Sequence, residues 1–195
     1  KLLRSWGRSS SLFDEKSEAI ENRFDVNLDG IDYDAKFVFE AVGYNVEGSE
    51  IGAAFGLEQL KKLKKNIITR KNNFKRQCDF FDQYKKYFSN PIETNNINTA
   101  WLAFPILINK NAPFTRKEFQ IYLEKRNIQT RVVFTGNIIR QPMMKGIKYK
   151  VSDRGYPNAD SVMERGVLLP LHHGLTDNMF ERLHKNISEF IENYL

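Results

Sequence analysis

The sequence predicts an α/β fold in which a small β-sheet is packed with helices. Three observations predict it: a long helical pattern that begins at Ile51, three short apolar runs typical of strands, and helix-capping residues between those runs. The expected order is long helix, strand, helix, strand, helix, strand, helix. Because one face of a sheet this small must be buried by other elements, the helices are expected to pack against it.

The first part of the chain is expected to contribute little to the core. Residues 1–40 are rich in polar and loop-forming residues. Within them, apolar and charged residues alternate at 36–40 (KFVFE), which predicts a short strand.

The long helix is predicted from its apolar spacing and its boundaries. Ser49 is suited to cap its start, and the pattern runs from Ile51 to about Phe88. Pro91 would end any helix that reached it, because proline lacks the backbone N–H that continues the helix.

Three strands are predicted in the second half of the chain, at 100–108, 130–134 and 167–171. Each is a short apolar run bounded by polar or turn-forming residues. The segment 136–144 (GNIIRQPMM), which follows the second run, is expected to be a loop or short turn.

Capping signals place the remaining helices. Residues 115–118 (TRKE) form a capping box that opens a helix ending near Lys125. Residues 157–160 (PNAD) open a short helix that ends near Gly166, and Thr176 caps the last helix. The predicted apolar face of that last helix comprises Phe180, Leu183, Ile187, Phe190 and Ile191.

Composition limits the classes of protein. With 41% hydrophobic residues in 195, the chain can bury a core, and one cysteine (Cys78) excludes an internal disulfide. The net charge of +6 is compatible with nucleic acid, but the cluster KKLKK at 61–65 fits a solvated helix face better. We therefore expect no nucleic-acid partner; an anionic small substrate also suits this charge.

The chain begins at Lys1, without a signal-peptide pattern and without an apolar run long enough to span a bilayer, about 20 residues. We expect a fragment or processed chain, no membrane partner, and the cytoplasm as its compartment.

Few residues indicate chemistry on their own. Walker A, GxGxxG and GxSxG motifs are absent, and one cysteine with three histidines fits no zinc spacing. His172 and His173 follow the third strand, where a site or a surface pair of histidines would both fit.

Two groups of residues are suited to bind anions. Asn45 precedes the long helix, where it could bind phosphate or simply form a turn. Arg131, Asn137, Arg140 and Gln141 cluster after the second strand, where they could recognise phosphate or form a salt-bridged surface. From the residues alone, the sequence indicates an α/β domain with residues suited to bind an anion.

Several segments resemble a known family. Residues 43–63 (GYNVEGSEIGAAFGLEQLKKL) resemble the DegT/StrS class of sugar aminotransferases, which use pyridoxal 5'-phosphate (PLP). Residues 130–144 (TRVVFTGNIIRQPMM) resemble one branch, the hexulose 3-dehydrase-like proteins of deoxysugar biosynthesis. Similarity to that branch continues at 6–8 (WGR), 22–24 (NRF), 33–45 (YDAKFVFEAVGYN) and 156–166 (YPNADSVMERG).

The resemblance implies the C-terminal part of a fold-type I PLP enzyme. Residues 1–45 would be the tail of its large PLP-binding domain, and 46–195 its small α/β domain. No lysine lies in the family's cofactor-lysine context, a serine-rich stretch before a GEGG-like turn. The chain is thus expected to begin after that lysine, to contain no catalytic residue, and to be inactive alone.

The sequence departs from the resembling branch at two places. CDP-4-keto-6-deoxyhexose 3-dehydrases carry a cysteine cluster after WGR, where this chain reads SSSLF at 9–13. Because iron–sulfur clusters need thiolate ligands, no such cluster is expected. Many relatives carry Arg or Lys where this chain has Glu47.

By resemblance, the intact protein is a PLP-dependent aminotransferase acting on a nucleotide-linked keto-sugar, with glutamate as amino donor. It would be a homodimer in which Asn45 reaches the PLP phosphate of the neighbouring subunit, while Arg131, Asn137 and Arg140 contact substrate. The alternatives are a PLP-dependent or pyridoxamine-phosphate-dependent 3-dehydratase without an iron–sulfur cluster, with histidine at the cofactor position, and a non-catalytic binding module.

Overall fold

The computed structural model describes residues 1–12 and 26–195, so the similarity at 22–24 lies outside the described residues. These residues form two compact units, 1–61 and 62–195, which are described separately.

Before the long helix, the described residues of the N-terminal unit form short turns and a hairpin. These are the 3-10 turns η1 (Leu2–Arg4), η2 (Ser9–Leu12) and η4 (Ala35–Phe37), and the antiparallel strands β1 (Val26–Leu28) and β2 (Ile31–Tyr33). The strand predicted at 36–40 is wrong. The Asp34 side chain accepts a hydrogen bond from the Lys36 N–H at 2.9 Å and starts a turn, and only Phe39 pairs, as an isolated bridge to Arg8.

The long helix α2 spans Glu50–Phe81. The predicted cap is confirmed: Ser49 Oγ accepts a hydrogen bond from the Gly52 N–H at 3.3 Å. The predicted end near Phe88 is wrong, because β3 (Phe88–Ser89) pairs with the next strand and buries Phe88 almost completely. Burial in the core outweighs the helical spacing there.

The C-terminal unit contains an antiparallel sheet of four strands in the order β3-β4-β6-β5. Strands β4 (Ala103–Ile108) and β6 (Gly166–Pro170) confirm two predicted runs, and the short β3 was not predicted. The second predicted run, 130–134, forms only β5 (Arg131–Val132). It is short because the Thr130 N–H donates to Glu124 Oε1, and because Phe134 adopts a positive φ of 43°.

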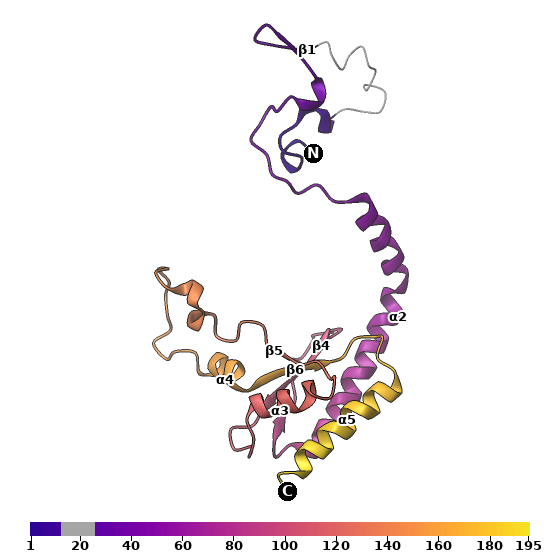
Figure 1. The fold of residues 1–195 in the computed structure, drawn as a ribbon, viewed down its shortest axis with the longest axis vertical. Coiled ribbons are helices and arrows are strands. Elements are labelled where there is room, and N and C mark those ends of the chain that lie inside the picture. The colour runs from indigo at the N-terminus through magenta and orange to yellow at the C-terminus, as the bar shows by residue number, and fades with distance from the viewer. Residues whose placement is uncertain (13–25) are drawn as a thin grey trace. The chain divides into compact units, whose positions relative to one another are not determined.

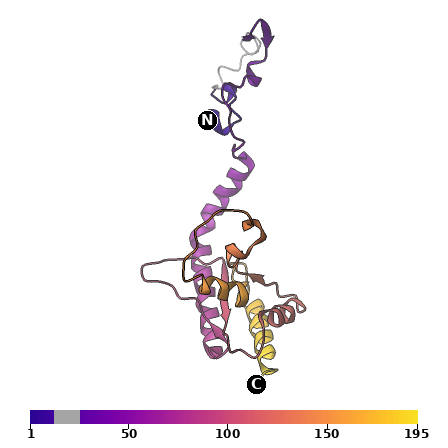
Figure 2. The same cartoon turned by 90° about the vertical axis from the view of Figure 1, so that its left-hand side faces the viewer.

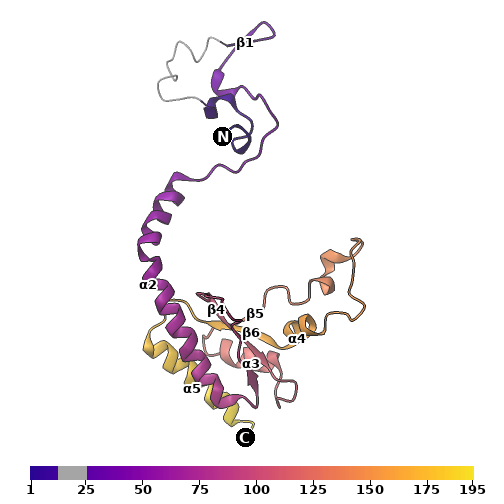
Figure 3. The same ribbon diagram turned by 180° about the vertical axis from the view of Figure 1, so that it is seen from behind.

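The predicted helices of this unit are confirmed. Helix α3 (Arg116–Glu124) starts with the capping box of Thr115 and Glu118, and α4 (Pro157–Arg165) leads directly into β6 (Figure 3). Helix α5 (Asp177–Glu192) is capped by Thr176, whose hydroxyl accepts from the Met179 N–H. Figure 2 shows α3 and α5 side by side.

The core lies between one face of the sheet and three helical segments: the later part of α2, α3 and α5 (Figure 1). Alternate residues of β4 point into it, as the period of a strand requires. All five residues of the predicted apolar face of α5 are buried. The fully buried side chains include Phe81, Phe104, Phe119, Leu123, Leu169 and Ile187.

Two polar residues of α2 bind the end of β6. The Asn73 amide donates to the carbonyls of Leu171 and His172, and Gln77 Nε2 donates to Pro170 O at 3.2 Å. Gln77 Oε1 is therefore left to accept from His184 Nε2 at 2.9 Å, which places the proton of the neutral imidazole on Nε2. The His184 ring stacks on Phe80, with centroids 3.9 Å apart.

The stability of this unit is expected to depend on His184 below neutral pH. Burial, with a contribution from Arg76, lowers the pKa of His184 from 6.5 to about 4. As the pH falls, His184 is therefore protonated at a higher pH in the unfolded chain than in the folded one. The free energy of unfolding that is present above pH 6.5 thus decreases as the pH drops towards 4. The decrease in melting temperature between about pH 7 and about pH 4.5 should be smaller in His184→Phe than in the wild type.

His173→Gln is the matched control, because His173 is exposed and makes none of these contacts. The same decrease in wild type and His184→Phe would contradict this role of His184.

No helix among the described residues is long and apolar enough to cross a membrane.

Candidate functional site

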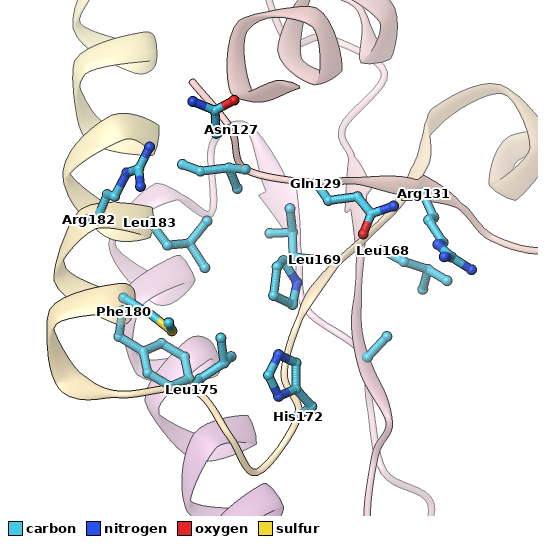
Figure 4. A pocket seen from close by; sticks show the side chains of 14 residues that line it. Asn127, Gln129, Arg131, Leu168, Leu169, His172, Leu175, Phe180, Arg182 and Leu183 are labelled. Carbon is cyan, nitrogen blue, oxygen red and sulfur yellow. The ribbon is translucent and has the colours of Figure 1, made fainter. Parts of the chain in front are cut away.

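A cavity of about 400 Å³ opens in the C-terminal unit beside β6. Its walls are β5 and the turn before it, the second half of β6, the loop after β6 and the first turns of α5 (Figure 4). The lining is mostly apolar and includes Ala103, Ile128, Leu168, Leu169, Pro170, Leu175, Met179, Phe180 and Leu183. Its volume lies in the range of small-molecule sites.

The cavity exists because β5 is short. Arg131 pairs with Leu168, so the following residues of β6 have no neighbour from β5. The preceding chain turns away, with Asn127 at a positive φ of 56°. The space left at this edge of the sheet lies between the strand and α5.

The polar groups of the cavity carry positive charge or are neutral. Arg131 and Arg182 lie on opposite sides, with His172 at a third position (Figure 4). The amides of Asn127 and Gln129 complete the polar lining, to which no carboxylate of residues 1–12 or 26–195 belongs. An apolar cavity with two guanidinium groups is suited to a ligand that combines an apolar part with an anion.

Two of these groups have internal partners. Arg182 Nη2 donates to the Arg126 carbonyl at 2.5 Å, and His172 Nδ1 accepts from the Gly174 N–H at 3.1 Å. Both His172 and His173 are exposed, as expected of a surface pair, but His172 also lines the cavity. Among the described residues, no side chain binds the guanidinium of Arg131.

The other two predicted substrate residues meet at one carboxylate. Asn137 Nδ2 donates to Asp160 Oδ1 at 2.7 Å, and Arg140 donates from Nε at 2.5 Å and from Nη2 at 2.7 Å. These bonds, first from Arg140 and then from Asn137, lower the pKa of Asp160 to about 2. The same bond raises the pKa of Arg140.

Asn45 lies in the N-terminal unit. It pairs with Ser5 as an isolated β-bridge, and its side chain is exposed. Within the described part of the chain, that side chain makes no hydrogen bond. Glu47 forms an ion pair with Arg4 at 3.0 Å, so its charge is already paired close to Asn45. An exposed amide with a free N–H₂ can supply one donor to a phosphate.

Several residues of the site are not predicted by the sequence. There, Asp160 indicates only the start of a helix, and Asn127, Gln129 and Arg182 carry no signal of their own. A signal existed for Asp160 alone: it is acidic and lies in the first turn of α4, after a segment rich in cations. The cavity residues come from separate elements and share no spacing in the sequence.

The fold places this chain in a class of enzyme. It superposes on the Escherichia coli GDP-4-keto-6-deoxy-D-mannose-3-dehydratase with bound hydrated PLP, with a TM-score of 0.72 and 26% identity. The match covers 94% of this chain and 45% of that one. Structural neighbours of this kind are fold-type I PLP enzymes, and the small sheet with its helices corresponds to part of such an enzyme.

Residues 12–188 match the model of the DegT/DnrJ/EryC1/StrS aminotransferase family, and the chain belongs to that family. It is 32% identical over 191 residues to a dTDP-4-dehydro-2,6-dideoxy-D-glucose 3-dehydratase of Saccharopolyspora spinosa, covering 97% of this chain and 41% of that protein. It is 33% identical over 147 residues to a dTDP-4-amino-4,6-dideoxy-D-glucose transaminase of Escherichia coli, covering 74% and 38%. The chain spans less than half the length of these relatives.

Proposed function

We propose that this chain is part of a PLP-dependent aminotransferase that acts on a nucleotide-linked keto-sugar in the synthesis of deoxyamino sugars for polysaccharides. The family match over residues 12–188 carries the proposal. The cationic cavity supports it, because a nucleoside diphosphate combines an anion with an aromatic base whose faces can pack against an apolar lining.

The roles of individual residues follow from that proposal. Arg131, Asn137 and Arg140 bind the substrate, and Arg131 does so from the cavity wall. Asn45 donates to the PLP phosphate of the neighbouring subunit in a homodimer; its exposed and unbonded amide is compatible with this. A lysine outside this chain holds the cofactor, and PLP supplies an electron sink when bound.

The remaining parts of the proposal concern the whole protein. Residues 1–45 belong to its large domain and 46–195 to its small domain. Glutamate is the amino donor, and the protein works in the cytoplasm. Neither nucleic acid nor membrane is a partner.

A second candidate is a nucleotide-sugar 3-dehydratase of the same family. The similarity to the Saccharopolyspora enzyme over nearly the whole chain favours it. Lysine at the cofactor position of the whole protein would support the aminotransferase, and histidine the dehydratase. A third candidate, a non-catalytic binding module, requires neither.

The test is to sequence the coding region upstream of Lys1 and then to assay the whole protein. With PLP, glutamate and nucleotide-linked 4-keto sugars, an amino-sugar product identified by mass spectrometry supports the aminotransferase. A product that has lost water without gaining nitrogen would replace it with the dehydratase. No turnover and no PLP binding would leave the binding module.

The 195-residue chain by itself is expected not to hold PLP covalently, because no lysine lies in the family's cofactor-lysine context. Adding PLP and then borohydride should give no stoichiometric adduct. One specific lysine modified at one PLP per chain, found by peptide mapping, would refute this.

The chain is also expected not to assemble an iron–sulfur cluster. Burial raises the pKa of the Cys78 thiol to about 11, so little thiolate is present at neutral pH, and Cys78 packs against the core cluster. Anaerobic reconstitution with iron and sulfide should leave the protein colourless. Cluster absorbance at one cluster per chain, lost in Cys78→Ala, would contradict the expectation.

A further inference from the structure

The carboxylate of Asp160 connects helix α4 to the segment 136–144. Oδ1 accepts from both Asn137 Nδ2 at 2.7 Å and Arg140 Nε at 2.5 Å, while Oδ2 accepts from Arg140 Nη2 at 2.7 Å. Asn137 is 4% exposed, whereas the Arg140 side chain is 59% exposed. One acidic group thus binds a buried amide and an exposed cation at the same time.

The bonds use only one edge of the Arg140 guanidinium. The carboxylate occupies Nε and Nη2, which form one of the two edges able to bind an anion bidentately. Within the described part of the chain, Nη1 binds no other group. The Nη1 edge therefore remains available to a phosphate or carboxylate while Asp160 fixes the plane of the guanidinium.

Asn137 also fixes the backbone of the segment. Its Oδ1 accepts from the Ile139 N–H at 3.3 Å and starts the 3-10 turn η6 (Ile138–Arg140), which carries Arg140. Asn137 therefore binds Asp160 and also positions Arg140, the second residue that binds Asp160.

Close packing leaves this segment little freedom against α4. Gly136 has a positive φ of 61°, and a Cβ there would lie 2.5 Å from Met163 Cβ. Gln141 Nε2 donates to the Thr135 carbonyl at 2.9 Å and closes the segment on itself.

We propose that Asp160 is a positioning residue for substrate binding: by holding Asn137 and one edge of Arg140, it presents the other edge of Arg140 to the anionic part of the substrate. This inference rests on the proposed function. Because its pKa is held near 2, Asp160 is ionised at every pH at which the protein would be assayed.

The test uses the whole protein and four nucleoside diphosphates as equilibrium ligands: dTDP, GDP, CDP and UDP. Asp160→Asn keeps the size of the side chain but removes its charge, and should weaken the binding of the preferred nucleotide about tenfold. Arg140→Ala should weaken it to a similar extent. Asp79→Asn is the control, because Asp79 is an exposed carboxylate on α2 that pairs with Lys75 and does not bind Arg140.

The double variant distinguishes positioning from a general structural effect. If Asp160 acts through Arg140, adding Asp160→Asn to Arg140→Ala should change the dissociation constant less than about twofold. Hydrogen exchange gives a second measurement. The amides of Arg140 and Gln141, which bind the carbonyls of Asn137 and Ile138, should exchange about tenfold faster in Asp160→Asn.

The outcomes separate the two proposals. Nucleotide binding that Asp160→Asn leaves unchanged, or full additivity in the double variant, would overturn the positioning role alone. Faster exchange without weaker binding would show that Asp160 is only structural, which also overturns it. A wild-type protein that binds none of the four nucleoside diphosphates would overturn the proposed function, and this inference with it.

Discussion

Replacing Phe119 by alanine is expected to lower the free energy of unfolding of the C-terminal unit by about 3–5 kcal/mol. Phe119 is 0% exposed, and the centroid of its ring lies 5.4 Å from the ring centroid of Phe88 and 5.3 Å from that of Phe190. Alanine would remove these contacts and leave a cavity where α3, α5 and β3 meet. Because domains are stable by only about 5–15 kcal/mol, the loss is a large fraction of the total.

Urea unfolding followed by circular dichroism measures this effect. Phe134→Ala is the matched control, since Phe134 is 87% exposed and its truncation should change stability by less than about 0.5 kcal/mol. Equal midpoints for the two variants, with an unchanged slope, would show that the core is not centred on Phe119.

Replacing Asn45 by alanine in the whole protein is expected to weaken PLP retention and abolish most activity without dissociating the homodimer. The amide would be lost as a phosphate donor in the partner's site, while the backbone bridge to Ser5 uses no side-chain atom. Bound PLP after gel filtration and the mass of the dimer measure the two effects. Asn95→Ala is the control, because Asn95 is also exposed.

Hybrid dimers give the decisive result. A subunit with Asn45→Ala is mixed with one that lacks the cofactor lysine, and subunits exchange at random. Half the dimers are then hybrids with one intact site of two, so about a quarter of the wild-type activity should return. Mixtures as inactive as their parents would show that Asn45 does not act across the interface.

The secondary structure of the C-terminal unit could largely be predicted, because local signals and burial agree there. The capping box at Thr115 and the cap at Thr176 lie where the helices start. The failures occur where tertiary contacts outweigh local pattern: Phe88 leaves the helical spacing to enter the core, and Asp34 starts a turn in an alternating segment. β5 is cut short by the bond from Thr130 to Glu124.

The site could be predicted only in part. Arg131 was singled out, and it lines the cavity, but Arg182 comes from a helix far along the chain and nothing in the sequence connects the two. Likewise, Asn137 and Arg140 were expected to share a site, whereas their common partner Asp160 is visible only in three dimensions. Contacts between distant segments depend on the fold and not on spacing.

The strand order also affects how the molecule is made. Strand β6 lies between β4 and β5 and joins both, yet it is the last of the four strands in the chain. During synthesis, β4 and β5 therefore leave the ribosome before their shared neighbour exists. A nascent chain that ends before Gly166 presents β4 with an open edge and its apolar face without α5, the condition in which chains aggregate or recruit chaperones. The sheet closes only after β6 has been synthesised.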